Sequence, residues 1–358
     1  METLKNLYRF SIRTGGNIMI FGPAGIGKTE GAQQAVVEEQ CESIYCNLSV
    51  LEAPDIMGLP MINRETKMTE YATPWFLPLK GTRKGKCVLI VDEIDKAKPE
   101  LQNPMLELFQ FRTINGRPTD IGAIIATGNL PDENAFSLPV SHALTNRCGI
   151  YRVMPAFEPW QQWATEAGVN GLVVGYLSKN QDFLLKPPPA GDDTAYCHPS
   201  PRAWVAAARD LDAVMKESVE YQTLLVSGRV GTAAAASFEV WLQHYRFIAP
   251  MIDALIHEGK KPNIANMTVD RVMVCAIAAC NEISALGRDV PADEKGRRDA
   301  RMLKVTQHVF GWLKEIPSDF AIGAAKNALS MKLIQDWKLT RIPELMKVFV
   351  EIRKSLVD

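Results

Sequence analysis

Residues 18–29 read Ile18-Met19-Ile20-Phe21-Gly22-Pro23-Ala24-Gly25-Ile26-Gly27-Lys28-Thr29. The apolar residues at the start of this stretch predict a buried strand, and the residues from Lys28 to about Gln40 predict a helix. Between them lies a glycine-rich loop with the spacing Gly-x-x-x-x-Gly-Lys-Thr. Placed between a strand and a helix, that spacing is the pattern of a phosphate-binding loop.

Each residue type in the loop has a physical reason to be there. Glycines allow backbone N–H groups to turn inward around a phosphate, at φ angles that a Cβ would penalise. The N-terminal end of the following helix adds the positive end of its dipole. The Lys28 ammonium suits the β- and γ-phosphates, and the Thr29 hydroxyl suits Mg²⁺. We therefore predict that a nucleotide binds through Gly22, Pro23, Ala24, Gly25, Ile26, Gly27, Lys28 and Thr29.

The composition is that of an ordinary globular protein, long enough for about two domains. The chain has 358 residues, of which 47% are hydrophobic and 23% charged, and its net charge is −1. Because a neutral chain exerts no overall attraction on nucleic acid, we interpret the short basic runs at 83–86 and 297–298 as solvated faces. No apolar run reaches the ~20 residues of a membrane-spanning helix, and the longest, Val272–Cys280, predicts a core helix.

Cysteine usage indicates a reducing compartment. The seven cysteines are scattered without a C-x-x-C pair, and the five histidines have no metal-ligand spacing. Such a pattern is typical of free thiols, not of a disulfide or zinc framework. Residues 1–13 predict an amphipathic helix, with Leu4, Leu7, Tyr8 and Ile12 on one side, rather than a signal peptide. We therefore expect a soluble, cytoplasmic protein.

The first half of the sequence alternates between predicted strands and helices. After the loop and its helix, strands are predicted at Ser43–Cys46, Cys87–Val91, Gly122–Thr127 and Gly149–Met154, and helices at Pro99–Gln110 and Val140–Asn146. This alternation predicts an α/β fold, a doubly wound domain with a mainly parallel sheet. Residues 47–75 interrupt it with prolines and mixed polarity, which is typical of an inserted functional element.

From residue 155 onward every predicted element is a helix. The helices are Trp160–Ala167, Arg202–Met215, Ala233–Phe247, Thr268–Leu286, Arg298–Lys314, Asp319–Trp337 and Pro343–Ser355. We predict three parts: an α/β nucleotide-binding domain at 1–155 with an insert at about 50–75, a helical lid at 156–250, and a helical C-terminal extension at 251–358.

Two adjacent carboxylates follow the predicted strand Cys87–Val91. Asp92 is placed to hold the water shell of Mg²⁺, so Thr29 and Asp92 are the predicted metal-site residues. Glu93 is then free to orient or deprotonate a water, the alternative being a surface salt bridge. We interpret Asp95 as structural.

Three further polar residues are candidates for the same chemistry. Asn129 follows a strand, where it could reach the γ-phosphate and the attacking water or simply form a turn. Arg147 ends a short helix, where it either complements the dipole or reaches a nucleotide on a neighbouring subunit. Arg202 begins a helix, where a cation opposes the dipole, and this misfit favours a ligand-binding role.

Together these motifs resemble those of AAA+ ATPases and, more narrowly, of the MoxR branch. The AAA+ resemblance covers about residues 15–205 and rests on Gly22–Thr29, Asp92-Glu93, Ala126-Thr127-Gly128-Asn129, Asn146-Arg147 and Ser200-Pro201-Arg202-Ala203-Trp204. The MoxR-like segments are Asp55–Pro60 and Pro74–Pro78, which resemble that branch's inserted hairpin, and Gln102–Leu108, which resembles the helix after its Walker B strand. One departure is Ala24, where a second proline is frequent.

The resemblance implies a role for each site residue. It implies Walker A for Gly22–Thr29, Walker B for Asp92 and Glu93 with Glu93 polarising water, sensor 1 for Asn129, an arginine finger acting between subunits for Arg147, and sensor 2 for Arg202. It also implies ATP and Mg²⁺ as cofactors, ATP hydrolysis, a homo-hexameric ring, and chaperone-like remodelling of a protein client. Proteins with a von Willebrand A domain are candidate partners.

Other readings stay open at this point. A nucleotide-gated binding switch with little turnover is opposed by the presence of Glu93 and Arg147, and a nucleic-acid motor by the neutral charge. A GTPase is disfavoured because no Asn-Lys-x-Asp segment occurs. We predict that the insert Asp55–Tyr71, with Trp75 and Phe76, contacts the client; core packing is the alternative for the two aromatic residues.

Overall fold

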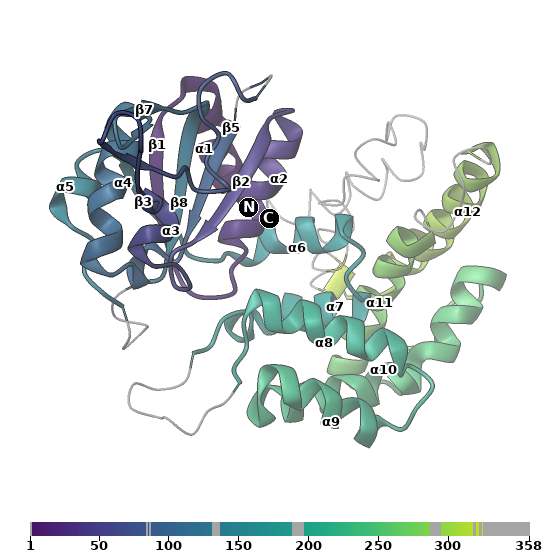
Figure 1. Cartoon of the computed structure of the whole chain (residues 1–358). Helices are drawn as coiled ribbons and strands as arrows, with labels where there is room; N and C mark the ends of the chain where they lie inside the picture. The colour runs from purple at the N-terminus through teal and green to yellow at the C-terminus, as the bar shows by residue number, and fades with distance from the viewer. Residues whose placement is uncertain are drawn as a thin grey trace. The chain divides into compact units, whose positions relative to one another are not determined.

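The structure is a computed structural model in which the chain divides into two compact units, Met1–Pro155 and Ala156–Asp358. It describes residues 2–83, 85, 87–130, 137–187, 197–286, 295–317, 320, 321 and 324. The predicted helices Asp319–Trp337 and Pro343–Ser355 lie essentially outside these residues. Each unit is considered by itself (Figure 1).

A five-stranded parallel sheet forms the centre of the first unit. Its strands are β1 (Asn17–Phe21), β2 (Glu42–Asn47), β5 (Cys87–Asp92), β8 (Ile121–Gly128) and β9 (Gly149–Arg152). They lie in the order β2-β5-β8-β1-β9, and every pair in this sheet is parallel. The prediction of a doubly wound α/β domain with a mainly parallel sheet is therefore confirmed.

Helices cover both faces of this sheet, which explains why its central strands β1, β5 and β8 are almost continuously apolar. The helices are α1 (Glu2–Thr14), α2 (Lys28–Glu38), α4 (Pro99–Phe111) and α5 (His142–Thr145), and η1 (Ile94–Lys96) is a short 3₁₀ turn. Alternate side chains of β1 enter opposite cores: Ile18 and Ile20 pack with α1 and α2, whereas Met19 packs with α4. Figure 1 shows the strands between these two groups of helices.

The predicted insert contains a short helix, α3 (Ala53–Met57), and an antiparallel hairpin of β3 (Pro60–Ile62) and β4 (Thr69–Tyr71). A second small hairpin, β6 (Thr113–Ile114) with β7 (Arg117–Pro118), follows α4 and was not expected from the sequence. The two aromatic residues after the insert differ. The side chain of Trp75 is 93% exposed, whereas Phe76 is buried in the core of the first unit.

In its described residues the second unit is entirely helical, as predicted. It contains α6 (Phe157–Glu166), α7 (Gly171–Lys179), η3 (Gln181–Phe183), α8 (Pro201–Ala213), α9 (Val219–Val230), α10 (Thr232–Glu258), α11 (Val269–Leu286) and α12 (Lys295–Leu313). The sequence predicts neither α7 nor α9, and it ends α10 at residue 247. One hydrophobic core joins α6 to α12, and α10 crosses residue 250, so the division of this unit into lid and extension stays a prediction.

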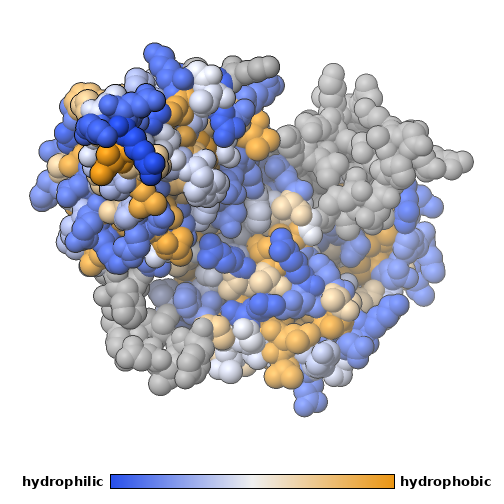
Figure 2. Space-filling view, viewed as in Figure 1, coloured by the Kyte–Doolittle hydropathy of each residue, from blue (hydrophilic) through white to orange (hydrophobic). Residues whose placement is uncertain are grey.

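No helix in the described part of the chain is both long and apolar enough to cross a membrane. The predicted core helix at Val272–Cys280 lies inside α11, and its residues are almost all buried. Figure 2 shows hydrophobic surface on the first unit among polar residues, toward the side where β3 lies. The exposed apolar residues of the insert include Leu59, Met61, Ile62 and Met68.

Candidate functional site

The loop after β1 has the backbone that the glycine pattern predicts. Gly25 and Gly27 have φ angles of 76° and 86°, in the left-handed region that a Cβ disfavours. Gly22 is restricted by space: a Cβ there would lie 2.4 Å from the carbonyl oxygen of Val153. Helix α2 begins immediately after this turn at Lys28, so its N-terminal N–H groups open onto the loop.

Lys28 is buried at the base of the loop, with 7% of the residue exposed. Its Nζ donates to the carbonyl oxygens of Gly22 (2.7 Å) and Pro23 (2.8 Å) and to Oδ1 of Asn129 (3.1 Å). From α1, the buried Tyr8 hydroxyl donates to the Lys28 carbonyl oxygen at 2.8 Å. The N-terminal helix therefore fixes the first turn of α2, and burial raises the pKa of Tyr8 so that it stays a donor.

Asp92, at the carboxyl end of β5, accepts hydrogen bonds on both carboxylate oxygens. Oδ2 accepts from the hydroxyls of Thr29 and Tyr45, each at 3.0 Å. Oδ1 accepts from the Thr127 hydroxyl and from the backbone N–H of Glu93, the latter at 3.0 Å. Because Val91 pairs with Ala126 in the parallel register, Thr127 on β8 lies beside Asp92.

Glu93 has a left-handed backbone, with φ 56° and ψ 43°. Such a conformation is uncommon for a residue other than glycine and occurs often at functional sites. Its carboxylate forms an ion pair with Lys96 at 3.1 Å, and both side chains are about one third exposed. A pair this exposed contributes only about 0–1 kcal/mol, so Glu93 can exchange this partner for another.

Asp95 is buried and holds the segment that follows β8. It accepts from the backbone N–H of Asn129 at 2.9 Å and from the Ser137 hydroxyl at 3.1 Å. The first contact leaves the Asn129 side chain directed at Lys28. These contacts support the structural role predicted for Asp95 and connect it to the placement of Asn129.

The two arginine candidates lie on other elements, Arg147 after α5 and Arg202 on α8. Arg147 follows α5, and its guanidinium donates to Oε1 of Gln110 from Nε (2.9 Å) and Nη2 (2.5 Å) and to the Ala143 carbonyl. Arg202 belongs to the second unit, where it is exposed in the first turn of α8. Ser200 caps that helix by accepting from the N–H of Ala203 at 3.2 Å.

The residues of the loop and of Asp92 fit a magnesium–nucleotide. Gly25 and Gly27 have the left-handed backbone that turns loop N–H groups inward, and the Thr29 hydroxyl and Asp92 carboxylate offer the oxygen ligands that Mg²⁺ prefers. Within the described residues, no three His, Cys, Asp or Glu side chains gather as a metal site. A metal held by few protein ligands together with water and phosphate is the usual situation for Mg²⁺.

Tyr8 and Tyr45 are site residues that lie outside every motif, and Thr127 lies inside the Ala126–Asn129 segment but had no role assigned to it. Tyr45 lies on β2, and its hydroxyl contacts Asp92 although 47% of the residue is exposed. Burial of the hydroxyl and the neighbouring Asp92 carboxylate raise the pKa of Tyr45 to about 12. The sequence signal for Tyr45 is its place near the carboxyl end of a strand, and Thr127 shares that signal in addition to its place beside Asn129.

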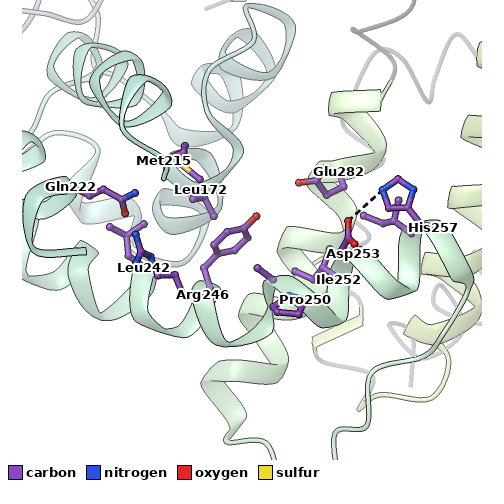
Figure 3. A pocket seen from close by; sticks show the side chains of 13 residues that line it. Leu172, Met215, Gln222, Leu242, Arg246, Pro250, Ile252, Asp253, His257 and Glu282 are labelled. Atoms are coloured by element: carbon purple, nitrogen blue, oxygen red, sulfur yellow. Dashed lines mark ion pairs between the residues drawn. The ribbon is translucent and has the colours of Figure 1, made fainter. Parts of the chain in front are cut away.

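The second unit has a cavity of its own, of about 560 Å³, beside α10 (Figure 3). Leu172, Met215, Leu242 and Ile252 give it apolar walls. Arg246 lies toward one end, and Asp253, His257 and Glu282 lie toward the other, where Asp253 contacts His257 at 3.4 Å. None of the predicted site residues lines this cavity.

The chain matches no protein-family model and no curated protein sequence. Among solved structures it is similar to NtrX from Brucella abortus, with 14% identity and a TM-score of 0.34, over 87% of this chain and 62% of NtrX. A complex of that NtrX with ADP aligns at 16% identity and a TM-score of 0.35, over 95% of this chain and 67% of that chain. RuvB from Thermotoga maritima, a Holliday junction branch migration motor, aligns at 13% identity and a TM-score of 0.37, over 73% and 78%.

At identities and TM-scores this low, the fold is defined by the strand order and the loop geometry. Numbered along the chain, the five strands of the main sheet lie in the order 2-3-4-1-5, which differs from the dinucleotide-binding and flavodoxin-like orders. This order places the strand that ends at Gly128 between the phosphate-loop strand and the Asp92 strand. The first unit therefore has a doubly wound parallel α/β fold with a phosphate-binding loop after its first strand, and a helical unit follows it in the chain.

Proposed function

We propose that this protein hydrolyses ATP as an AAA+ ATPase of the MoxR type. One observation carries the proposal: Lys28, Thr29, Asp92 and Asn129 converge, through hydrogen bonds of 3.0–3.1 Å, at the carboxyl ends of three neighbouring strands. Ligands bind at that edge in open α/β sheets. Phosphoryl transfer uses groups of these kinds beside a phosphate-binding loop: a lysine, a hydroxyl, a carboxylate and an amide.

Each residue then has a defined task. The loop amides and Lys28 bind the triphosphate, and Asn129 orients Lys28 and the attacking water. Glu93 leaves its ion pair with Lys96 and accepts a proton from that water or orients it. Thr29 and Asp92 hold Mg²⁺, which would neutralise charge on the β- and γ-phosphates.

We further propose that Arg147 acts on the nucleotide of a neighbouring copy of the chain and that Arg202 acts as sensor 2. Two observations support a mobile Arg147: the residue is only partly buried, and its guanidinium is held by the neutral oxygens of the Gln110 amide and the Ala143 carbonyl. A contact between subunits implies a ring, for which we propose a homo-hexamer.

The proposed task of the ring is chaperone-like remodelling of a protein client, with a von Willebrand A domain protein as partner. The insert supports this proposal because it exposes Leu59, Met61, Ile62 and Met68, and Trp75 follows nearby. Exposed apolar side chains that lie together on a protein surface often mark a site of interaction with another protein. The seven free thiols fit the proposed cytoplasmic location.

A binding switch with little turnover is the second candidate, because Glu93 is paired with Lys96 in this structure. Steady-state phosphate release with Mg·ATP, measured over a range of protein concentrations, separates the two. Hydrolysis by a ring predicts a rate per subunit that rises with concentration. ATP binding without phosphate release at any concentration would favour the switch. A nucleic-acid motor predicts stimulation by DNA or RNA at low salt, which the net charge of −1 argues against.

A further inference from the structure

Tyr45 connects the edge strand of the sheet to the carboxylate at the centre of the site. It lies on β2, where its Cα pairs with Ile90 of β5, two residues before Asp92. The ring extends along the strands toward their carboxyl ends, and its hydroxyl donates to Oδ2 of Asp92 at 3.0 Å. Strand β2 carries none of the sequence motifs, and Tyr45 is the residue through which it contacts the site.

The contact completes a symmetrical set of restraints on Asp92. Each carboxylate oxygen accepts two hydrogen bonds, from Thr29 and Tyr45 on Oδ2 and from Thr127 and the Glu93 N–H on Oδ1. The donors come from different elements, so the plane of the carboxylate is fixed from several directions. Without the Tyr45 hydroxyl, Oδ2 would keep the hydrogen bond from the Thr29 hydroxyl.

This restraint matters for the metal because Thr29 has a second task. If the Thr29 hydroxyl oxygen ligates Mg²⁺, the metal restricts where the Thr29 proton can point. The Tyr45 hydroxyl would not ligate the metal, so it can donate to Asp92 without that restriction. Groups that hydrogen-bond metal-site carboxylates orient them, and their loss typically lowers metal affinity about 10- to 100-fold. The alternative is that the Tyr45 ring only packs at the edge of the sheet. In that case, removing the hydroxyl alone would leave the metal affinity unchanged.

We propose that Tyr45 is a positioning residue for the Mg²⁺ site, which fixes the Asp92 carboxylate in the orientation that the metal's water shell requires. This inference rests on the proposed nucleotide-binding function and assigns it a residue outside the phosphate loop and the Asp92-Glu93 pair.

The test is Tyr45→Phe, which keeps the ring and removes only the hydroxyl. Thermal stabilisation by ADP is measured as Mg²⁺ is titrated, so no turnover is needed. We expect the Mg²⁺ midpoint to rise roughly tenfold, while stabilisation by ADP in EDTA stays that of the wild type. Tyr221→Phe is the control, because Tyr221 is 45% exposed against 47% for Tyr45 and lies in the second unit.

Three outcomes overturn the inference, and they are distinguishable. An unchanged Mg²⁺ midpoint in Tyr45→Phe shows that the hydroxyl has no positioning role, whereas the proposed function survives. An equal loss of ADP stabilisation with Mg²⁺ and with EDTA shows a general structural role. A wild-type protein whose ADP stabilisation is absent or independent of Mg²⁺ removes the proposed function together with the inference.

Discussion

Replacing Lys28 with alanine tests the phosphate-binding loop most simply. In the free protein, its ammonium makes three hydrogen bonds of 2.7–3.1 Å in a nearly buried position. We expect a bound nucleotide to receive about two charge-assisted bonds from it, each contributing roughly 1.5–3 kcal/mol. Their loss of about 3–6 kcal/mol corresponds to a decrease in affinity of about 10²- to 10⁴-fold.

The expected thermal shifts follow from this loss. ATP at about 100 times its Kd stabilises the folded state by about 2.7 kcal/mol. For a unit of the size of residues 1–155, each kcal/mol raises Tm by about 2–4 °C, so the wild-type shift is about 5–10 °C. A 100-fold weaker Kd leaves about 0.4 kcal/mol at the same ATP concentration, which is a shift of only about 1–2 °C.

The assay is thermal unfolding followed by circular dichroism, with and without ATP in EDTA to prevent turnover. Lys98→Ala is the matched control, because that lysine is exposed and forms its ion pair with the exposed Glu52. The control should keep the full wild-type shift. A Lys28→Ala variant that is stabilised by ATP as strongly as the wild type would refute the assignment of this loop as the nucleotide site.

Two further predictions concern the subunit contact and the packing of the loop. Arg147→Ala should bind ATP normally but lose at least about 10³-fold in turnover, and mixing it with Lys28→Ala should restore part of that turnover through mixed interfaces; no recovery at any ratio would contradict action between subunits. Gly22→Ala should destabilise the first unit by roughly 1–3 kcal/mol or more in urea unfolding, because its Cβ would overlap the Val153 carbonyl. Gly85→Ala is the control, since a Cβ there meets nothing within 4 Å, and equal midpoints for the two variants would contradict the packing argument.

The elements nearest the phosphate loop were predictable because their signals are local. The glycine spacing requires left-handed turns, and Gly25 and Gly27 adopt them. The continuous apolar runs indicate strands covered on both faces, and β5 (Cys87–Asp92) is almost fully buried. Asp92 and Asn129 could then be placed together, because the carboxyl ends of parallel strands share one edge.

Contacts set by register were not predictable. Tyr45 reaches Asp92 because β2 pairs with β5 in a particular alignment, and Thr127 does so because β8 lies on the other side of β5. The pattern of a single sequence indicates where each strand lies, but it does not show which strands pair or in which register. The left-handed conformation of Glu93 and its pairing with Lys96 likewise depend on the turn that follows β5.

In the second unit, two helices differ from the predictions, and each has a residue of low helix propensity inside it. The sequence predicts no helix at Gly171–Lys179, yet Gly175 lets α7 approach its neighbours closely: a Cβ there would lie 3.0 Å from Ile277 and 3.1 Å from Trp241. Pro250 does not end α10, which continues to Glu258. At Gly175, tertiary packing outweighs local propensity.

The proposal of ATP hydrolysis is tested most directly by phosphate release from Glu93→Gln at saturating Mg·ATP. The substitution keeps the shape of the side chain and removes its ability to accept a proton. We predict wild-type ATP affinity and a decrease in kcat of about 10²- to 10⁴-fold, the usual contribution of a general base. A Glu93→Gln protein that releases phosphate at the wild-type rate would contradict the assignment of this residue and the mechanism built on it.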